Sequence, residues 1–224
     1  SACHGACRAG EVDLVPEELG GGWEVMKKVK RALDPLNIMN PGKYLLDQAK
    51  VLGTDVSDAD AVLDHVLAFG AGIVARLAAD GAQVAFTYAN SRTRAEDVAA
   101  AVIASGGIAH AIHADSMKEE DVTSAVTQTV ERFGSLDIVI NNAAVGTFGP
   151  IDELKMDEID AMLTINVRSA VVTIRASLSH MGSGGRIINI GSINADRTPF
   201  PGQSVYALTK GAVVQFVRSM STGR

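Results

Sequence analysis

The chain has 224 residues, 47% of them hydrophobic, and carries a formal net charge of −6 with a pI near 5.3. Its length and apolar content suit one domain, or one domain with an appendage. The acidic balance argues against nucleic acid or an anionic membrane as the main partner. No apolar run approaches the roughly 20 residues of a membrane span, and the amino end lacks a signal-peptide pattern, so we expect a cytoplasmic protein.

Residues 1–50 differ in character from the rest of the chain. Helical periodicity predicts a helix at Trp23–Leu33, which Asp34-Pro35 ends because proline disfavours helix in the residue before it. Cys3 and Cys7 flank His4, but no second ligand pair follows, so we interpret the cysteines as ordinary thiols and expect no metal.

Two short segments of this region carry a resemblance. Ser1-x-x-His4-Gly5 and Asn40-Pro41-Gly42 resemble the carboxyl-terminal end of FAD-linked oxidases of the glycolate oxidase and D-lactate dehydrogenase type. The resemblance implies that His4 and Asn40 lie near a flavin in such oxidases. The flavin-binding domain that should precede them is absent from the sequence, so we predict a capping or tethering helix and turn without bound FAD.

Helical and strand patterns alternate from residue 70 onward. Short apolar runs predict four strands, at Gln83–Tyr88, Ile108–Ala114, Leu136–Ile140 and Ile187–Ile190. Periodic segments between them predict helices at Ala71–Asp80, Thr93–Ser105, Lys118–Phe133, Asp157–Met181 and Val205–Arg218. This alternation predicts the α/β class: a Rossmann-like, doubly wound parallel sheet in three layers with right-handed crossovers and a small amino-terminal helical appendage.

The main chemical pattern lies between residues 187 and 210. Ser192 follows the strand Ile187–Ile190 and so stands at a sheet's carboxyl end, where open α/β sheets bind ligands. Tyr206 and Lys210 are four residues apart and share one helix face. A positive charge beside a phenol favours the phenolate, so we expect the lysine to lower the pKa of the tyrosine. Tyr and Lys at this spacing also occur as plain surface pairs; the preceding strand and serine favour a catalytic interpretation.

Together, Ser192 and Tyr206-x-x-x-Lys210 resemble the catalytic signature of the short-chain dehydrogenase/reductase family. The resemblance implies an NAD(P)(H)-dependent oxidoreductase that reduces a carbonyl or oxidises a secondary alcohol. It further implies that Tyr206 passes the proton, Ser192 binds the oxygen, Lys210 tunes Tyr206 and orients the ribose, and Asn166 in Thr-Ile-Asn-Val holds a water behind the lysine.

Other residues match cofactor positions of that family. Asn141-Asn142-Ala143-Ala144 resembles the N-N-A-G segment along the cofactor, with Ala144 in place of glycine, and Asp115 resembles the acid that reaches the adenine. Arg92 suits a 2′-phosphate and favours NADP(H), with NAD(H) still open. Each also has an ordinary structural interpretation, because Asn pairs cap loops, Asp ends strands in turns, and arginines start exposed helices.

The sequence departs from the family at both ends. Gly70 fits the last glycine of the T-G-x-x-x-G-x-G phosphate turn, but Leu63, Asp64 and Ala68 replace its threonine and other glycines, so we expect weak nucleotide binding. The chain stops at Arg224, before the family's last strands and substrate-covering segment. We therefore expect a sheet that is incomplete at its C-terminal side.

These observations predict a chimera with three parts: an oxidase-like fragment at 1–50, a junction at 51–69 and a partial short-chain dehydrogenase/reductase domain at 70–224. The residues 88–92 look most like the 3-oxoacyl-carrier-protein reductase branch, which implies a small carbonyl or alcohol substrate that is free or acyl-carrier-linked. We expect a homo-dimer or tetramer, with Tyr206's helix and Asp157–Met181 available for pairing. Two alternatives stay open: an inactive scaffold that binds no nucleotide, and a fragment of a flavin-dependent oxidase.

Overall fold

The computed structural model describes residues 59–198 and 201–221. The chain divides into two units, residues 1–82 and 83–224, which are described separately. The predictions for residues 1–50, including those for His4 and Asn40, lie outside the described residues.

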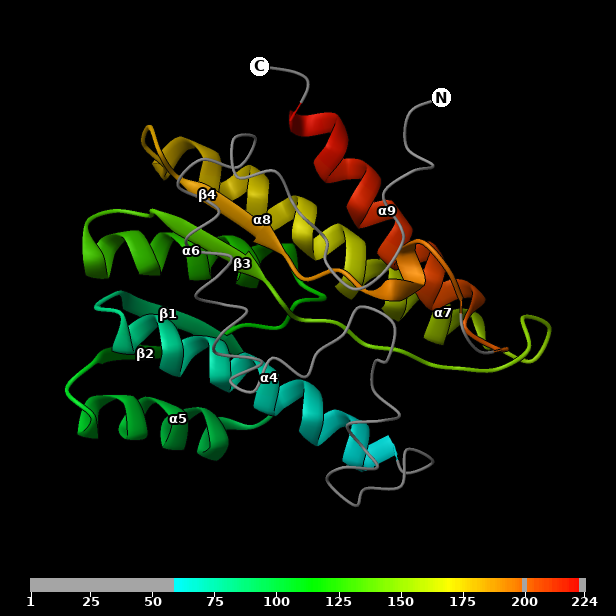
Figure 1. Cartoon of the computed structure of the whole chain (residues 1–224), viewed down its shortest axis with the longest axis horizontal. Helices are drawn as coiled ribbons and strands as arrows, with labels where there is room; N and C mark the ends of the chain where they lie inside the picture. Colours follow the sequence, from blue (N-terminus) through cyan, green and yellow to red (C-terminus); the bar gives the residue numbers. More distant parts are fainter. Residues whose placement is uncertain (1–58, 199–200, 222–224) are drawn as a thin grey trace, which may run out of the picture. The chain divides into compact units, whose positions relative to one another are not determined.

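In the first unit the described element is one long helix, α4, at Ala59–Ala79 (Figure 1). The helix predicted from Ala71 is present, but it begins at Ala59 because the preceding residues contain no proline and favour the same conformation. Gly70 consequently lies inside α4. The interior of an α-helix uses its backbone N–H groups in i to i−4 bonds, so none is free for a phosphate. The prediction that Gly70 closes a phosphate-binding turn is therefore wrong.

The second unit contains four strands in two parallel pairs. β1 (Gln83–Tyr88) pairs with β2 (Ile108–His113), and β3 (Ile138–Asn141) pairs with β4 (Arg186–Asn189). All four predicted strands are thus confirmed: β1 has the predicted limits, and the ends of the other three shift by one or two residues. Parallel pairing is also confirmed, as expected where each strand is followed by a helix.

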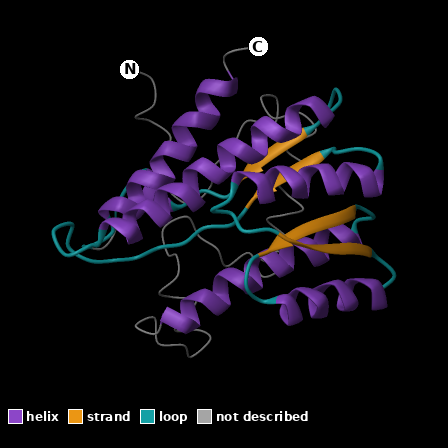
Figure 2. Cartoon of the chain, turned by 180° about the vertical axis from the view of Figure 1, so that it is seen from behind, coloured by secondary structure: helices purple, strands orange, loops and turns teal. Residues whose placement is uncertain are grey.

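The predicted sheet is divided in two. Among the described residues, β1 is hydrogen-bonded only to β2, and β3 only to β4, so the strand order is β1-β2 and, separately, β3-β4 (Figures 1 and 2). One helical layer joins the two pairs: α6 (Glu119–Phe133) contacts β1 and β2 and packs against α8 (Ser169–Ser177), which contacts β3. The fold is an incomplete Rossmann-like α/β fold.

The helix predictions of this unit are confirmed, with one unexpected feature. The predicted helix Asp157–Met181 is interrupted by a π-helical turn. The remaining elements are α5 (Arg92–Ala104), α7 (Met156–Leu163), the π-helix η1 (Thr164–Arg168), the 3-10 turns η2 (Leu178–His180) and η3 (Ile193–Ala195), and α9 (Ser204–Ser221). A π-turn is rare and is frequently found at functional sites.

Local chemistry explains where α6 begins and ends. Three acids, Glu119, Glu120 and Asp121, occupy its first turn and complement the helix dipole, and Gly134 ends it at φ 82°. Its buried Ala125 packs with Ile112 of β2 and with Ala114, which follows this strand. The small alanine side chains allow the helix and the strand to approach closely. No helix in the described part of the chain is long and apolar enough to cross a membrane.

Candidate active site

The carboxyl ends of β3 and β4 lie side by side and form the base of the candidate site. The Asn141 Nδ2 donates to the Asn189 Oδ1 at 2.8 Å, and the Ile190 N–H donates to the Asn141 carbonyl at 2.9 Å. Both strands continue from this edge into loops that carry the predicted site residues. The structure therefore brings the Asn142–Ala144 segment and Ser192 to the same end of one sheet.

Tyr206 meets Ser192 in this region. Ser192 precedes η3, where its Oγ accepts a hydrogen bond from the Asn194 N–H at 3.2 Å and so caps the turn. Burial raises the pKa of the Tyr206 phenol, while a side-chain hydrogen bond with Ser192 acts in the opposite direction. The net direction is upward, so the phenol is a neutral O–H group at neutral pH and can donate a proton.

Lys210 is buried under Tyr206, with 4% of its surface exposed. Its Nζ donates to the Ile190 carbonyl at 3.0 Å and lies 5.7 Å from the centroid of the Tyr206 ring. Burial lowers the pKa of this ammonium. The expected net lowering of the Tyr206 pKa is wrong, because desolvation of the phenol is the largest influence on this group and raises its pKa.

Asn166 lies in the π-helix and is 95% buried, with both amide hydrogens and the amide oxygen hydrogen-bonded. Its Oδ1 accepts from the Val145 N–H at 2.8 Å, and its Nδ2 donates to the Val145 carbonyl at 2.8 Å and to the Thr209 Oγ1 at 3.0 Å. The side chain therefore joins the loop after β3 to α9. Through Thr209, which donates to the Tyr206 carbonyl, the network joins Asn166 to the turn of α9 that carries Tyr206 and Lys210; Thr209 is a member that sequence reasoning missed.

Two loops meet beside the phenol. The Gly149 N–H donates to the Gly202 carbonyl at 2.9 Å, and Gly202 has φ +76°, where a Cβ would lie 3.0 Å from the Gly149 nitrogen. The loop that contains Gly149 also carries Phe148, whose ring stands edge-to-face with Tyr206 at 5.6 Å between centroids. Gly149-Pro150 and Pro201-Gly202 are sequence signals for turns, but nothing in the sequence indicates that the turns contact each other.

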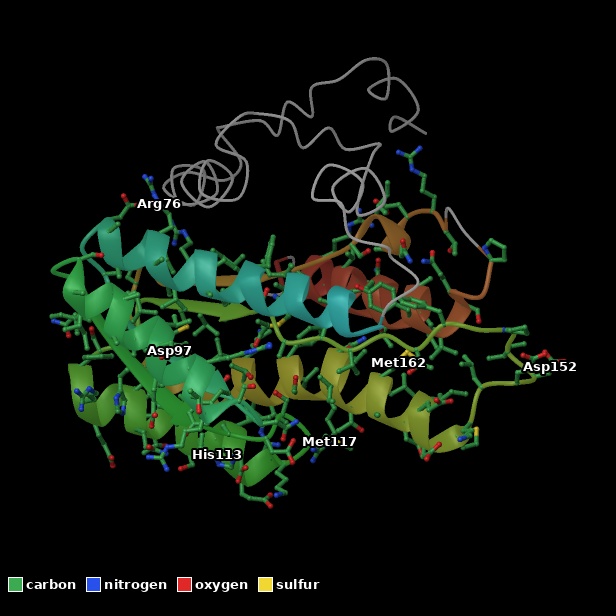
Figure 3. The ribbon with its side chains drawn as sticks, turned by 90° about the horizontal axis from the view of Figure 1, so that it is seen from below. Arg76, Asp97, His113, Met117, Asp152 and Met162 are labelled. Carbon is green, nitrogen blue, oxygen red and sulfur yellow. The ribbon has the colours of Figure 1, made fainter. Side chains whose placement is uncertain are left out.

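Met162 of α7 holds the loop that contains Phe148 and Gly149. It has 0% exposure, and its Sδ accepts a hydrogen bond from the Thr147 N–H at 3.4 Å. Figure 3 shows Met162 on α7, whereas Asp152 lies at the end of the extended loop that precedes this helix. The portion of the loop next to Tyr206 is thus fixed to the helices, whereas its far end projects from them.

The predicted cofactor residues outside this centre have other partners. Asp115 Oδ1 accepts from the Met117 N–H at 2.9 Å, in the turn marked by Met117 in Figure 3, and its carboxylate pairs with Lys118 at 3.7 Å. Arg92 begins α5 with 77% of its side chain exposed and pairs with Glu96 at 2.7 Å. Both ion pairs are at the surface, where such pairs contribute little, so either residue can exchange its partner for a ligand.

This arrangement of a strand-end serine, a half-buried tyrosine above a buried lysine, and a buried asparagine defines a class of protein. The chain belongs to the short-chain dehydrogenase family, whose sequence pattern, described as "short chain dehydrogenase", matches residues 65–223. A second pattern, "FAD linked oxidases, C-terminal domain", matches residues 1–44.

Individual relatives agree with this membership. The chain is 38% identical over 152 residues to versicolorin reductase stcU of Emericella nidulans, covering 68% of this chain and 58% of the relative. It is 33% identical over 174 residues to tetrahydroxynaphthalene reductase of Pyricularia oryzae, covering 76% of this chain and 62% of that enzyme. The chain therefore spans about three fifths of the length of these relatives.

Solved structures give the same result. A short-chain dehydrogenase/reductase from Serratia marcescens has a TM-score of 0.67 and 52% identity, covering 68% of this chain and 62% of that one. A short chain dehydrogenase from Burkholderia cenocepacia, solved in complex with NADP, has a TM-score of 0.65 and 44% identity, covering 68% and 63%. The chain is thus an oxidoreductase-family protein whose fold matches that of these neighbours over the shared portion.

Proposed function

We propose that this protein is an NADP(H)-dependent oxidoreductase that reduces a carbonyl or oxidises a secondary alcohol. The observation that carries the proposal is the cluster of Ser192, Tyr206 and Lys210 at the carboxyl ends of β3 and β4, where Lys210 donates to the Ile190 carbonyl and burial keeps the phenol neutral. A neutral phenol beside a hydroxyl suits a group that must give a proton to an oxygen atom.

Each side chain has a role in this reaction. A nicotinamide cofactor, when bound, would supply or accept the hydride at the carbonyl carbon. As the C–H bond forms, the Tyr206 O–H gives its proton to the carbonyl oxygen, which the Ser192 hydroxyl orients. The Lys210 ammonium lies 5.7 Å from the ring centroid and stabilises the phenolate that results. Asn166 maintains the spacing between the loop after β3 and α9.

The described residues fit one half of such a cofactor better than the other. Asn142, Ala143 and Ala144 follow β3 directly, and the next residue, Val145, is held at both its N–H and its carbonyl by Asn166, so this loop is ready to line a nicotinamide and ribose. For the pyrophosphate the fit is poor, because Gly70 lies inside α4. We therefore expect binding weaker than that of an intact phosphate turn.

Cofactor choice is assigned to Arg92. Its exposed guanidinium pairs only at the surface with Glu96, and Arg suits a phosphate because its planar fork binds two oxygens at once. Arg92→Ala should raise the Kd for NADPH about tenfold or more and leave that for NADH within twofold. Equal effects on both nucleotides would exclude contact with a 2′-phosphate and leave NAD(H) as the cofactor.

The substrate is proposed to be a small molecule with a carbonyl or alcohol beside an apolar group. Phe148 stands edge-to-face with Tyr206 and is 52% exposed, so it offers an apolar wall next to the proton donor. The relatives named for versicolorin and tetrahydroxynaphthalene support a reductase of small molecules. An acyl-carrier-linked substrate remains within the proposal.

A homo-oligomer is also proposed. Apolar side chains are exposed along the helices α7 to α9, among them Leu163, Val171, Leu208 and Val217. Burying such residues in a two-fold pairing of helices would remove apolar surface from water. Light scattering after size exclusion should give a mass of twice or four times 23.4 kDa; a mass of one chain at micromolar concentration would remove this part of the proposal.

A second candidate function is a scaffold that binds no nucleotide and performs no chemistry. Two observations favour it: Gly70 lies within a helix, and among the described residues β1 and β3 are not hydrogen-bonded to each other. Neither is expected of an intact cofactor-binding sheet with its phosphate turn.

One experiment separates the two candidates. NADPH is titrated into the full chain while its fluorescence is followed, and its oxidation is then measured at 340 nm with an aromatic ketone and an acetoacetyl thioester. The oxidoreductase should saturate below millimolar NADPH, and Tyr206→Phe should bind equally well but turn over at least about a hundredfold more slowly. Thr173→Val, which removes a hydroxyl that donates to the Ser169 carbonyl inside α8, is the control. Absence of saturable binding would establish the scaffold instead.

A further inference from the structure

Thr209 is one of the three residues between Tyr206 and Lys210, none of which takes part in the proposed chemistry. It lies on α9 with 0% exposure, although threonine is a polar residue that is mostly exposed in proteins. Its Oγ1 accepts from the Asn166 Nδ2 at 3.0 Å and donates to the Tyr206 carbonyl at 2.7 Å. The single hydroxyl thus connects two residues of the candidate site.

The hydroxyl has no replacement in this position. The Thr209 hydroxyl donates its one hydrogen to the Tyr206 carbonyl. It accepts a hydrogen bond from the Asn166 amide, which donates its other hydrogen to the Val145 carbonyl. Because Thr209 is fully buried, water does not reach this point to take over either bond. A chain of hydrogen bonds therefore runs from the loop after β3 through Asn166 and Thr209 to the first turn of α9.

We propose that Thr209 is a positioning residue, whose hydroxyl fixes the first turn of α9 against the Val145 loop and so holds the Tyr206 phenol against Ser192. For its catalytic consequence this inference rests on the proposed function. Its structural consequence does not, because the position of the phenol can be measured in a protein that performs no reaction.

The variants separate the hydroxyl from the shape of the side chain. Thr209→Val keeps the shape and removes the hydroxyl, whereas Thr209→Ser keeps the hydroxyl and removes the methyl. Thr173→Val is the matched control, since the Thr173 Oγ1 donates to the Ser169 carbonyl at 2.8 Å inside α8 but contacts no site residue in the described hydrogen bonds.

The first readout is the titration of Tyr206 itself. The chain has three tyrosines, so a protein labelled with carbon-13 at tyrosine Cζ gives three resonances, of which Tyr206→Phe identifies one. The phenol's neighbours are Ser192, Lys210 and Phe148. Loosening the contact with Ser192 removes the influence that lowers the pKa, so Thr209→Val should raise the Tyr206 pKa above that of the wild type. Thr209→Ser and Thr173→Val should match the wild type.

The second readout is turnover. Thr209→Val should lower kcat about ten- to hundredfold, because a misplaced proton donor is costly, while the KM for the carbonyl stays within about twofold. Thr209→Ser should restore kcat. If the wild type reduces no carbonyl, the proposed function fails, and the tyrosine titration alone decides the role of Thr209.

Several results would overturn the inference. A folded Thr209→Val protein with wild-type Tyr206 titration would show that the hydroxyl positions nothing, as would a Thr209→Ser variant as impaired as the valine variant. If Thr209→Val does not fold, Thr209→Ala is measured in its place. Failure of both to fold, with the serine variant intact, would assign the hydroxyl to stability and not to the site.

Discussion

Replacement of Asn166 by alanine tests the network that joins the three parts of the candidate site. The substitution removes one acceptor and two donors at once, with partner distances of 2.8, 2.8 and 3.0 Å. It leaves behind the N–H and carbonyl of Val145 and the hydroxyl of Thr209. The cost depends on whether water reaches these groups after the change.

The two ends of the network differ in access to water. Val145 is 38% exposed, so water replaces its two bonds at a net loss of about 0.5–1 kcal/mol each. Thr209 is fully buried and gains no water, but it keeps its bond to Tyr206 and loses only an incoming donor. With the space left by the side chain, the free energy of unfolding should fall by about 2–3 kcal/mol.

Urea unfolding followed by circular dichroism measures this difference. Asn194→Ala is the matched control, because Asn194 is also buried but its amide makes a single bond, to the Gln203 Oε1 at 3.0 Å, and should cost about 1 kcal/mol. If Asn166→Ala lowers the free energy of unfolding no more than Asn194→Ala does, the reasoning is refuted, because three hydrogen bonds would then contribute no more than one.

Two other changes have definite outcomes. Gly202→Ala should lower the free energy of unfolding by about 2 kcal/mol, because it forces an L-residue to φ +76° and sets a Cβ 3.0 Å from the Gly149 nitrogen. Gly134→Ala is the control: Gly134 has φ +82° and open space around it, so this variant should lose only the backbone strain of about 1 kcal/mol. Equal urea midpoints for the two variants would argue against the clash. Lys210 has a pKa lowered by burial, so the folded state binds fewer protons than the unfolded state between that lowered pKa and 10.5, and stability should rise with pH across this window by at most about 1.4 kcal/mol per pH unit. Lys210→Met should remove this rise while leaving the Ile190 carbonyl without its donor; urea titrations from pH 7 to pH 10.5 that keep the same slope in the variant would assign the pH dependence to another group.

Much of the fold was predictable because it depends on local pattern. The strand Gln83–Tyr88 has the predicted limits, and the others differ by one or two residues, since runs of β-branched and apolar side chains mark strands wherever they lie. The approach of Ser192 to Tyr206 was predictable for a similar reason: a residue after a parallel strand stands at the sheet's carboxyl edge, and four-residue spacing places Tyr206 and Lys210 on one helix face.

Features that depend on contacts between distant segments were not predictable in this way. Asn166 bonds to Val145 and Thr209, which are 21 and 43 residues away, and the π-turn that carries Asn166 has no sequence signal of its own. The direction of the Tyr206 pKa shift was predicted wrongly because charge spacing is visible in a sequence whereas burial is not. Burial requires the whole set of neighbours.

The sequence alone therefore determined which segments are strands and helices, that the strands pair in parallel, and which polar residues reach one end of the sheet. Tertiary structure alone decided that the described strands form two separate pairs, β1-β2 and β3-β4, and that Thr209 completes the site. The physical reason is range: periodicity and spacing act over a few residues, whereas hydrogen-bond partners and desolvation are settled only when remote segments meet.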